Sequence, residues 1–330
     1  MNTINHLDLF SGVGGFSLGL REAGVQVGWH GFSDIDKFAN TVFKERFPDA
    51  KELGSIEHID IDKLPRIDIV TFGFPCQDLS IAGRRKGFDG SRSSLFFKAI
   101  EIIERKKPKY FVFENVKGFY SSNAGKDFTT ALQTVADIGY DGQWQLLNTR
   151  WFLPQNRERI YFVGHIRGEC RPKVFPVREN GCISNKSQAE AQKEGEWVRS
   201  KNPQSANCIS ARYYKDGSEN LIDTGLYEIP EATKKGYAVA REGDSINLSQ
   251  PESKTRRGRV GKGVAQTLDT GMQQYTIQSG IRRLTPIECE RLQGFPDGWT
   301  RGQSDTQRYK QMGNAVSVPV VKSIMEKLYK

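Results

Sequence analysis

The tripeptide Pro75-Cys76-Gln77 places a thiol directly after an apolar run from Ile67 to Phe72. The proline fixes the direction of the chain where a predicted strand ends, so the thiol projects from a rigid support. A cysteine held in this way is a candidate nucleophile for covalent catalysis. Cysteine is also a common small core residue, so Cys76 alone leaves an inert buried thiol open.

A glycine-rich turn from Asp8 to Gly15 could bind a ligand. It lies between a predicted strand and a predicted helix, where the backbone can approach a ligand and the helix start offers unpaired N–H groups. Its spacing is not the dinucleotide fingerprint, which disfavours a nicotinamide cofactor; a tight turn without a ligand stays open. Asp34, after the next predicted strand, could accept hydrogen bonds from both hydroxyls of a ribose. We expect Asp36 to be either solvated or a cap of the following helix.

Three further charged residues follow or precede predicted strands. Glu114 comes directly after the apolar run Tyr110 to Phe113, at the edge of the sheet where ligands bind in open α/β folds. There it could hold or deliver a proton, although an exposed strand-end glutamate is the plain alternative. Arg157 and Arg159 are two residues apart and face the same side if the chain is extended. Either could hold a phosphate or carboxylate with two hydrogen bonds.

The elements that would position these residues alternate between strand-like and helix-like patterns. This alternation predicts an α/β fold with a mainly parallel sheet and helices on both faces. The predicted strands are 6–10, 26–29, 67–72, 110–113 and 160–164, and the predicted helices are 16–23, 36–43, 95–106, 286–292 and 318–329.

The composition of the chain favours some classes of binding partner and excludes some types of site. The 330-residue chain has a formal net charge of +9 and a pI near 9.2, which favours a polyanion such as nucleic acid. Its five cysteines include no Cys-x-x-Cys pair, so neither a disulfide framework nor a metal site is expected. We see no signal segment and no apolar stretch of the roughly 18 residues that a membrane span needs. The expected location is cytoplasmic.

The amino-acid composition changes between residues 168 and 280, which are rich in Gly, Ser, Asn, Lys and Arg. This composition predicts a smaller, loop-rich domain. A basic cluster within it is interpreted as an arm that contacts phosphates, with a solvated loop as the alternative. The cluster comprises Lys254, Arg256, Arg257, Arg259 and Lys262.

Together these segments resemble the DNA cytosine-5 methyltransferases of bacteria and phages. Six motifs occur in the order of that family. The resemblance covers the whole chain except the variable stretch at about 168–280, which matches only through Gln266-Thr267-Leu268. The motifs are Asp8 to Gly15, Gly73-Phe74-Pro75-Cys76-Gln77, Glu114-Asn115-Val116, Gln155 to Arg159, Arg283 to Pro296, and Gln311 to Val316.

The resemblance implies a Rossmann-like methyltransferase fold that uses S-adenosylmethionine and flips its target cytosine out of double-stranded DNA. Cys76 matches the thiolate that adds to C6 of the base, and Glu114 matches the group at N3. Arg159 would hold the base and stabilise the adduct, with Arg157 in support. The implied catalytic residues are Cys76, Glu114, Arg157 and Arg159.

The resemblance also implies a cofactor site. Ser55 stands where family members usually have an aspartate that contacts the adenine amine, and Ile35 stands where many have a large aromatic residue. The implied cofactor residues are Phe10, Ser11, Gly12, Gly14, Gly15, Asp34, Ile35, Ser55, Ile56, Pro75, Leu95 and Asn314.

For DNA, the segment Ser80 to Ser94 resembles the loop that closes over the flipped base. The expected DNA contacts are Ser80, Arg84, Arg85, Lys86, Arg92, Arg256, Arg257, Arg259 and Thr267. We expect residues 1–178 and 305–330 to form the catalytic and cofactor-binding domain, and residues 179–304 to form the target-recognition domain and hinge. We expect a monomer, encoded by a bacterium or phage, that acts on double-stranded DNA. The existence of a cognate restriction endonuclease as a functional, non-physical partner is left open by the sequence.

Three other classes of protein would differ from this sequence in specific features. A tRNA-directed relative would have a short variable region with Cys-Phe-Thr, a tripeptide absent here. An amino-methyltransferase would carry Asp/Asn/Ser-Pro-Pro-Tyr/Phe in place of Pro-Cys-Gln. A catalytically silent DNA-binding relative would not need the intact set of Cys76, Glu114, Arg157 and Arg159.

Overall fold

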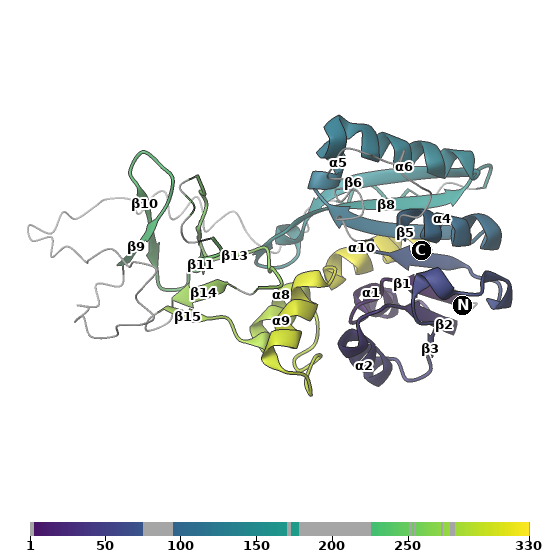
Figure 1. Ribbon diagram of the computed structural model, residues 1–330, viewed down its shortest axis with the longest axis horizontal. Helices are drawn as coiled ribbons and strands as arrows, with labels where there is room; N and C mark the ends of the chain where they lie inside the picture. Colours follow the sequence, from purple (N-terminus) through teal and green to yellow (C-terminus); the bar gives the residue numbers. More distant parts are fainter. Residues whose placement is uncertain are drawn as a thin grey trace, which may run out of the picture.

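The computed structural model describes residues 3–74, 95–169, 173–177, 226–250, 253, 255–271, 273–277 and 281–329. Figure 1 shows a large lobe built on a sheet and a smaller lobe of short strands, with helices α8 and α9 between them. The marked chain ends both lie on the large lobe. The C-terminal part of the chain therefore returns to the lobe in which the N-terminal part begins.

The large lobe contains a seven-stranded sheet in the order β3-β2-β1-β4-β5-β8-β6. The strands from β3 to β5 pair in parallel, whereas β8 runs antiparallel to both β5 and β6. The prediction of a mainly parallel sheet is thus confirmed. Its strands are β1 (Ile4–Leu9), β2 (Val27–Ser33), β3 (Lys51–Glu52), β4 (Ile69–Phe72), β5 (Tyr110–Val116), β6 (Tyr140–Asn148) and β8 (Glu158–Ile166).

Helices cover both faces of this sheet. The helices described are α1 (Gly15–Glu22), α2 (Lys37–Arg46), α4 (Leu95–Lys106), α5 (Gly118–Ser121), α6 (Lys126–Asp137), α8 (Pro286–Gln293), α9 (Asp305–Asn314) and α10 (Val318–Tyr329). Short 3-10 turns are η1 (Ile56–His58), η2 (Ile61–Lys63), η4 (Ser122–Gly125) and η5 (Thr149–Trp151).

Alternation along the central strands explains the two-sided core. Successive side chains of a strand point to opposite faces. Phe111 and Phe113 of β5 therefore join the cluster beneath α4 and α6, while Val112 joins the cluster formed with α1 and α10. Burial on both faces is the reason why these strands read as continuous apolar runs in the sequence.

The segment after the small lobe packs back onto the glycine turn. Trp299 is almost completely buried and donates from Nε1 to the carbonyl oxygen of Val13 at 2.9 Å. Arg46 of α2 donates to the carbonyl oxygens of Gly298 and Trp299. Cys289 of α8 belongs to the same apolar cluster as Val13. The domain boundary at 304 remains a prediction, and this packing favours an earlier one, near residue 284.

The small lobe is built from short antiparallel strands around a small apolar cluster that includes Ile229, Ile246 and Ile277. The pair β7–β13 is parallel and connects the lobes, with Gln155 opposite Ala265. The strands are β7 (Gln155–Asn156), β9 (Leu226–Pro230), β10 (Tyr237–Arg241), β11 (Ser245–Asn247), β12 (Val260–Gly261), β13 (Ala265–Gln266), β14 (Gln274–Ile277) and β15 (Ile281–Arg283).

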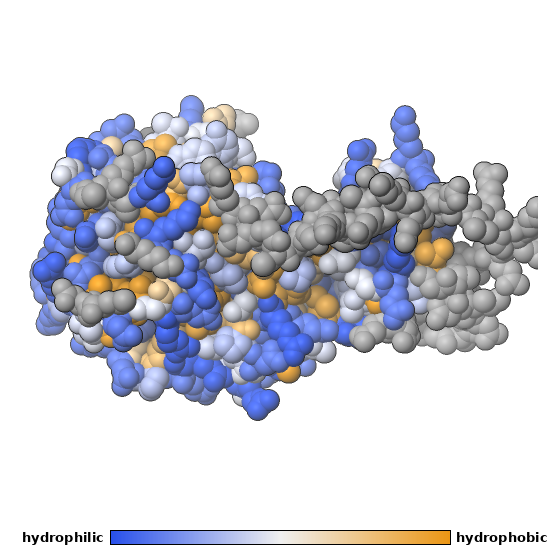
Figure 2. Space-filling view, turned by 180° about the vertical axis from the view of Figure 1, so that it is seen from behind, coloured by the Kyte–Doolittle hydropathy of each residue, from blue (hydrophilic) through white to orange (hydrophobic). Residues whose placement is uncertain are grey.

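The described residues contain neither a membrane-spanning helix nor a cluster of metal ligands. None of their helices combines the length and the apolar character that crossing a membrane requires. Nor do they contain a group of three or more His, Cys, Asp or Glu side chains placed to hold a metal ion. Figure 2 shows hydrophilic side chains over much of the large lobe, with smaller hydrophobic patches between them.

Candidate active site

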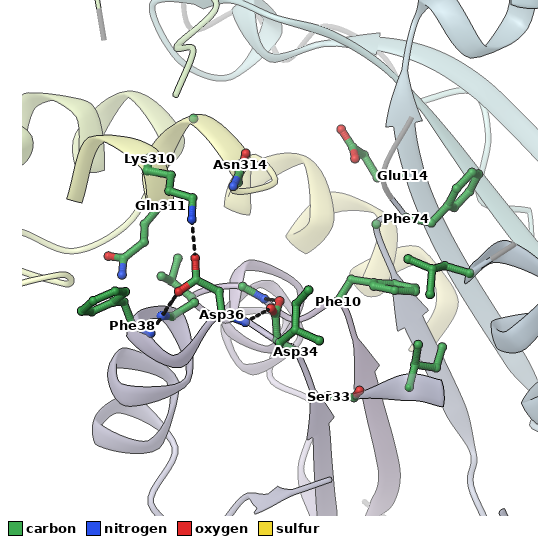
Figure 3. Close-up of a pocket in the computed structure, with 18 of the residues that line it drawn as sticks. Phe10, Ser33, Asp34, Asp36, Phe38, Phe74, Glu114, Lys310, Gln311 and Asn314 are labelled. Carbon is green, nitrogen blue, oxygen red and sulfur yellow. Dashed lines mark hydrogen bonds and ion pairs between the residues drawn. The ribbon is translucent and has the colours of Figure 1, made fainter. Parts of the chain in front are cut away.

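A cavity of about 1100 Å³ opens at the carboxyl ends of the central strands. Strand β1 pairs there with β2 on one side and β4 on the other, which is the switch point where α/β sheets bind ligands. In Figure 3, Glu114 and Phe74 lie on one side of this cavity and Asp36 and Lys310 on the other. Asp34 lies between these two groups.

Glu114 and Arg159 form an ion pair in the wall of the cavity. Nε of Arg159 lies 2.8 Å from Oε1 of Glu114, and the two side chains are 15% and 12% exposed. The register of the sheet causes this contact. Glu114 is opposite Tyr161 and Arg159 is opposite Val116, so the two charged residues are diagonal neighbours on adjacent strands. Two predicted catalytic residues therefore meet at one place.

Arg157 is placed differently from Arg159, although it also lines the cavity. It is 3% exposed, and its guanidinium donates to the carbonyl oxygens of Leu268, Gly313 and Ala315 at 3.3, 3.2 and 2.9 Å. Burial lowers the pKa of Arg157 to about 10, so it remains cationic at neutral pH. These bonds make Arg157 a clamp on the main chain at the end of α9.

Asp34 is held rigidly at the end of β2. One carboxylate oxygen accepts from the N–H of Gly12 and the other accepts from the N–H of Asp36, both at 2.8 Å. Each oxygen keeps a further lone pair for a ligand. Asp36 caps α2 by accepting from the N–H groups of Phe38 and Ala39, as predicted.

The glycine turn divides into residues that face the cavity and residues that pack elsewhere. Phe10 lines the cavity with its backbone in the left-handed region (φ 52°), a strained conformation typical of functional sites. Gly12 lines it with open space where a Cβ would lie. A Cβ on Gly14 would lie 2.6 Å from the ring of Phe47, and one on Gly15 would lie 2.6 Å from Val316. Close packing therefore explains these last two glycines.

The remaining cofactor predictions fall largely on the same cavity. Ile35, Ser55, Ile56, Leu95 and Asn314 all line it. The hydroxyl of Ser55 caps the turn η1 by accepting from the N–H of Glu57 at 3.3 Å, and Ile35 is 83% exposed. Ser11 does not line the cavity, although its buried hydroxyl has no partner.

The segment that carries Cys76 continues from the cavity wall. Gly73 and Phe74 line the cavity, and the side-chain amide of Asn115 donates to the carbonyl oxygen of Phe74 at 3.2 Å. Asn115 thus fixes the last described residue before Pro75. The predicted residues Pro75, Cys76, Ser80, Arg84, Arg85, Lys86 and Arg92 lie outside the described residues.

The predicted DNA-contacting residues of the small lobe differ in exposure. Arg257 is exposed and donates to the carbonyl oxygen of Ala232, and Arg256 is half-buried. Arg259 is 3% exposed and donates to the carbonyl oxygen of Gln250. Thr267 donates to the carbonyl oxygen of Asn156, next to the connection between the lobes. Arg259 is thus placed inside the lobe.

Sequence reasoning gave no site role to several residues that line the cavity. Asp36 was expected only as a solvated or capping residue, and Phe38 and Lys310 were not singled out. Asn115 and Gln311 were noticed only as parts of motifs. For Lys310, its place directly before the motif that begins at Gln311 is the signal that could have led to it.

The fold and the cavity define a Rossmann-like α/β protein with an added antiparallel strand and a ligand site at the switch point. The chain matches the family model of the C-5 cytosine-specific DNA methylase over residues 4–330. It belongs to that family, and it is a DNA cytosine-5 methyltransferase.

Similar proteins agree with this assignment. The chain is 33% identical to the type II methyltransferase M1.ScrFI of Lactococcus lactis subsp. cremoris, over 98% of this chain and 77% of that protein. It is 35% identical to the type II methyltransferase M.NgoBI of Neisseria gonorrhoeae, over 96% and 90%. A methyltransferase of Entamoeba histolytica, EhMeth, shares the fold with a TM-score of 0.59 at 18% identity, over 100% of this chain and 98% of that one.

Proposed function

We propose that this chain transfers a methyl group from S-adenosylmethionine to C5 of a cytosine flipped out of a specific double-stranded DNA sequence, through a covalent bond between Cys76 and C6. The observation that carries the proposal is the ion pair of Glu114 and Arg159 in the wall of the cavity that also contains Asp34 and Phe10. One cavity thus holds groups suited to a pyrimidine and groups suited to a nucleoside.

The residues present fit S-adenosylmethionine. Asp34 offers lone pairs to the ribose hydroxyls, and the half-buried ring of Phe10 offers a face for the adenine. The open space at Gly12 lets a ligand approach the backbone closely. Ile35, Ser55, Ile56, Leu95, Asn314 and, by family resemblance, Pro75 complete the proposed site. When bound, this cofactor supplies an electrophilic methyl group.

The protein's own groups activate the base. C5 of cytosine is a weak nucleophile, and addition of the Cys76 thiolate to C6 makes it enamine-like. Glu114 stabilises this change by a hydrogen bond to N3, and Arg159 holds both Glu114 and the base. After methylation, water acts as the base that takes the C5 proton, and the electrons of the C5–H bond form the C5–C6 double bond and expel the thiolate from C6. Arg157 keeps the end of α9 in place.

We extend the proposal to the biological role. Proteins similar to this chain include type II methyltransferases and an orphan methyltransferase of Bacillus phage SPR. The net charge of +9 favours binding to a polyanion. We propose that the chain marks double-stranded DNA against a cognate restriction endonuclease, and that the small lobe reads the sequence in the major groove.

Two measurements test the proposal. Bisulfite sequencing of plasmid DNA from cells that express the protein should give a single methylated motif. DNA with 5-fluorocytosine at that position should trap a covalent complex that mass spectrometry maps to Cys76. Cys76→Ser should abolish both signals, and Cys289→Ser, which changes a thiol outside the cavity, should retain both. Methylation by the Cys76→Ser protein would refute the covalent route.

A further inference from the structure

The wall of the cavity at the end of α9 is fastened on two sides. Toward the Glu114–Arg159 pair, Arg157 holds the carbonyl oxygens of Gly313 and Ala315. This fastening is buried, and the backbone of Gly313 also packs tightly, since a Cβ there would lie 2.7 Å from the carbonyl carbon of Asp269. A buried, hydrogen-bonded cation is costly to release. This side of the wall is therefore fixed.

The opposite side is fastened by an ion pair between an exposed lysine and a half-buried aspartate. Nζ of Lys310 on α9 donates to Oδ2 of Asp36 at 2.8 Å, and the two residues are separated by 274 positions in the sequence. The side chains are 45% and 23% exposed, and both residues line the cavity. Figure 3 shows this contact crossing from α9 to the start of α2, at the end of the cavity away from Glu114.

The surroundings of the pair identify this end as the mouth of the cavity. Ile35 and Phe38, on either side of Asp36 in sequence, are 83% and 38% exposed although they are large and apolar. Both line the cavity. Exposed apolar side chains at the rim of a cavity are suited to partial coverage by a bound ligand. Next to Asn314, Gln311 is 4% exposed and its side-chain amide has no partner, so this wall has spare polar groups.

We propose that Asp36 and Lys310 form a charged clasp across the mouth of the cavity, which holds α9 against α2 and slows the departure of the methyl donor and of its demethylated product. The inference rests on the proposed function, in which this cavity holds the donor. Both are positioning residues, since they act by keeping the wall that carries Asn314 closed. An exposed ion pair is weak and screened by salt, so the clasp can open while Arg157 holds the other side.

Two variants remove the ion pair without removing other contacts. Asp36→Asn keeps an oxygen that can cap α2, because asparagine is as good an N-cap as aspartate. Lys310→Gln keeps most of the aliphatic stem. Each should raise the dissociation constant and the dissociation rate of S-adenosylmethionine by about two- to five-fold, as the loss of an exposed pair implies. The KM for the donor should rise in step, whereas the single-turnover rate at saturating donor should change less.

Salt and the double variant give independent readouts. In the unmodified protein, the donor should dissociate faster as salt is raised, and this salt dependence should shrink in both single variants. The double variant should bind S-adenosylmethionine no more weakly than the single variant with the lower affinity, because each change removes the same interaction. Lys44→Gln is the matched control. Lys44 lies on α2, the helix that Asp36 caps, and pairs with Glu52 at 2.8 Å. Neither Lys44 nor Glu52 lines the cavity.

The outcomes separate this inference from the proposed function. Asp34→Ala, at the proposed ribose site, should weaken donor binding strongly. If Asp34→Ala weakens binding while Lys310→Gln and Asp36→Asn leave the dissociation rate unchanged, the clasp is refuted and the donor site stands. An equal effect of Lys44→Gln would also refute the clasp. If Asp34→Ala has no effect, the assignment of the donor to this cavity fails.

Discussion

Glu114 and Arg159 meet across the antiparallel pair β5–β8, with 2.8 Å between Oε1 and Nε. The guanidinium of Arg159 also donates from Nη1 to the carbonyl oxygen of Glu158 at 2.8 Å, so its position does not depend on the carboxylate alone. Removing the charge of Glu114 should therefore leave Arg159 in place. The pair thus allows the chemistry of the carboxylate to be tested without collapse of the wall.

Glu114→Gln is expected to lower the single-turnover methylation rate by about 10²-fold or more, because glutamine has the same shape but can neither carry nor release the proton of a carboxyl group. Circular dichroism and thermal unfolding should show an intact fold. An unchanged methylation rate would remove Glu114 from the mechanism. Glu158→Gln is the control, since Glu158 pairs with Lys117 at the surface and does not line the cavity.

Arg157→Lys is expected to destabilise the protein by about 2 kcal/mol, because one ammonium cannot reach the three carbonyl oxygens that the planar guanidinium serves, and a buried carbonyl without a donor is costly. Urea unfolding measures the change. The matched control is Arg167→Lys on an exposed side chain that pairs with Asp141. A loss of free energy no greater than that of the control would contradict the clamp.

A polar cluster beneath the glycine turn gives a prediction about pH. Asp8 is fully buried and accepts hydrogen bonds from the hydroxyls of Ser17 and Thr71 at 2.6 and 2.9 Å. Burial raises the pKa of Asp8 to about 7. His6 contacts Thr71 and His30 contacts Ser17, and burial lowers the pKa of both rings. The cluster therefore contains groups whose titrations oppose one another.

Between about pH 4 and pH 7 the folded protein holds a proton on Asp8 that the unfolded chain has lost, so this group makes the free energy of unfolding fall as the pH rises. Asp8→Asn lacks this slope. The stability of Asp8→Asn relative to the unmodified protein should thus increase from pH 5 to pH 8, by roughly a few kcal/mol. The comparison cancels most of the opposite slope from the histidines. A difference that stays constant with pH would show that Asp8 does not titrate in this range.

Cys289 should resist alkylation in the native protein. It is buried in α8, and burial raises the pKa of its thiol to about 12, so almost no thiolate is present at pH 8. Iodoacetamide labelling followed by peptide mapping should modify Cys289 only after unfolding. Its rapid modification in the native protein would show that the α8 region opens, and would remove Cys289→Ser as a silent control.

The local sequence predicted the helices and strands better than it predicted the contacts between them. Apolar runs predicted the strand that begins at Tyr110 and the helix from 318 to 329, and capping chemistry gave Asp36 a role at the start of α2. The structure confirms these three features. The direction of β8 was not predictable, because an apolar strand buried on both faces has the same pattern in either orientation. Residues 118–148, which form α5, α6 and β6, were not interpreted from the sequence.

The parts of the site that could not be predicted depend on contacts between residues far apart in the sequence. By family resemblance, Arg157 was predicted to support Arg159 in catalysis. The carbonyl oxygens that it binds lie 111 to 158 positions away in the sequence. The partner of Asp36 lies 274 positions away on α9. Such contacts depend on how α9 returns to the large lobe, and no local pattern encodes this return. The motifs therefore led to residues that line one cavity, such as Glu114 and Arg159, whereas the contacts that support this cavity could not be predicted from them.

The basic cluster of the small lobe should divide into two functional classes. Arg256 and Arg257 retain exposed surface, so changing both to Ala should weaken DNA binding and reduce the slope of log affinity against log salt by about two. Arg259 is buried and its guanidinium donates from Nη2 to the carbonyl oxygen of Gln250 at 2.9 Å, a contact that alanine cannot make. Arg259→Ala should therefore lower the stability of the lobe. Fluorescence anisotropy over a salt series, together with thermal unfolding, separates the two effects. An unchanged salt slope in the Arg256/Arg257 variant would assign these side chains to a solvated loop that does not contact phosphates.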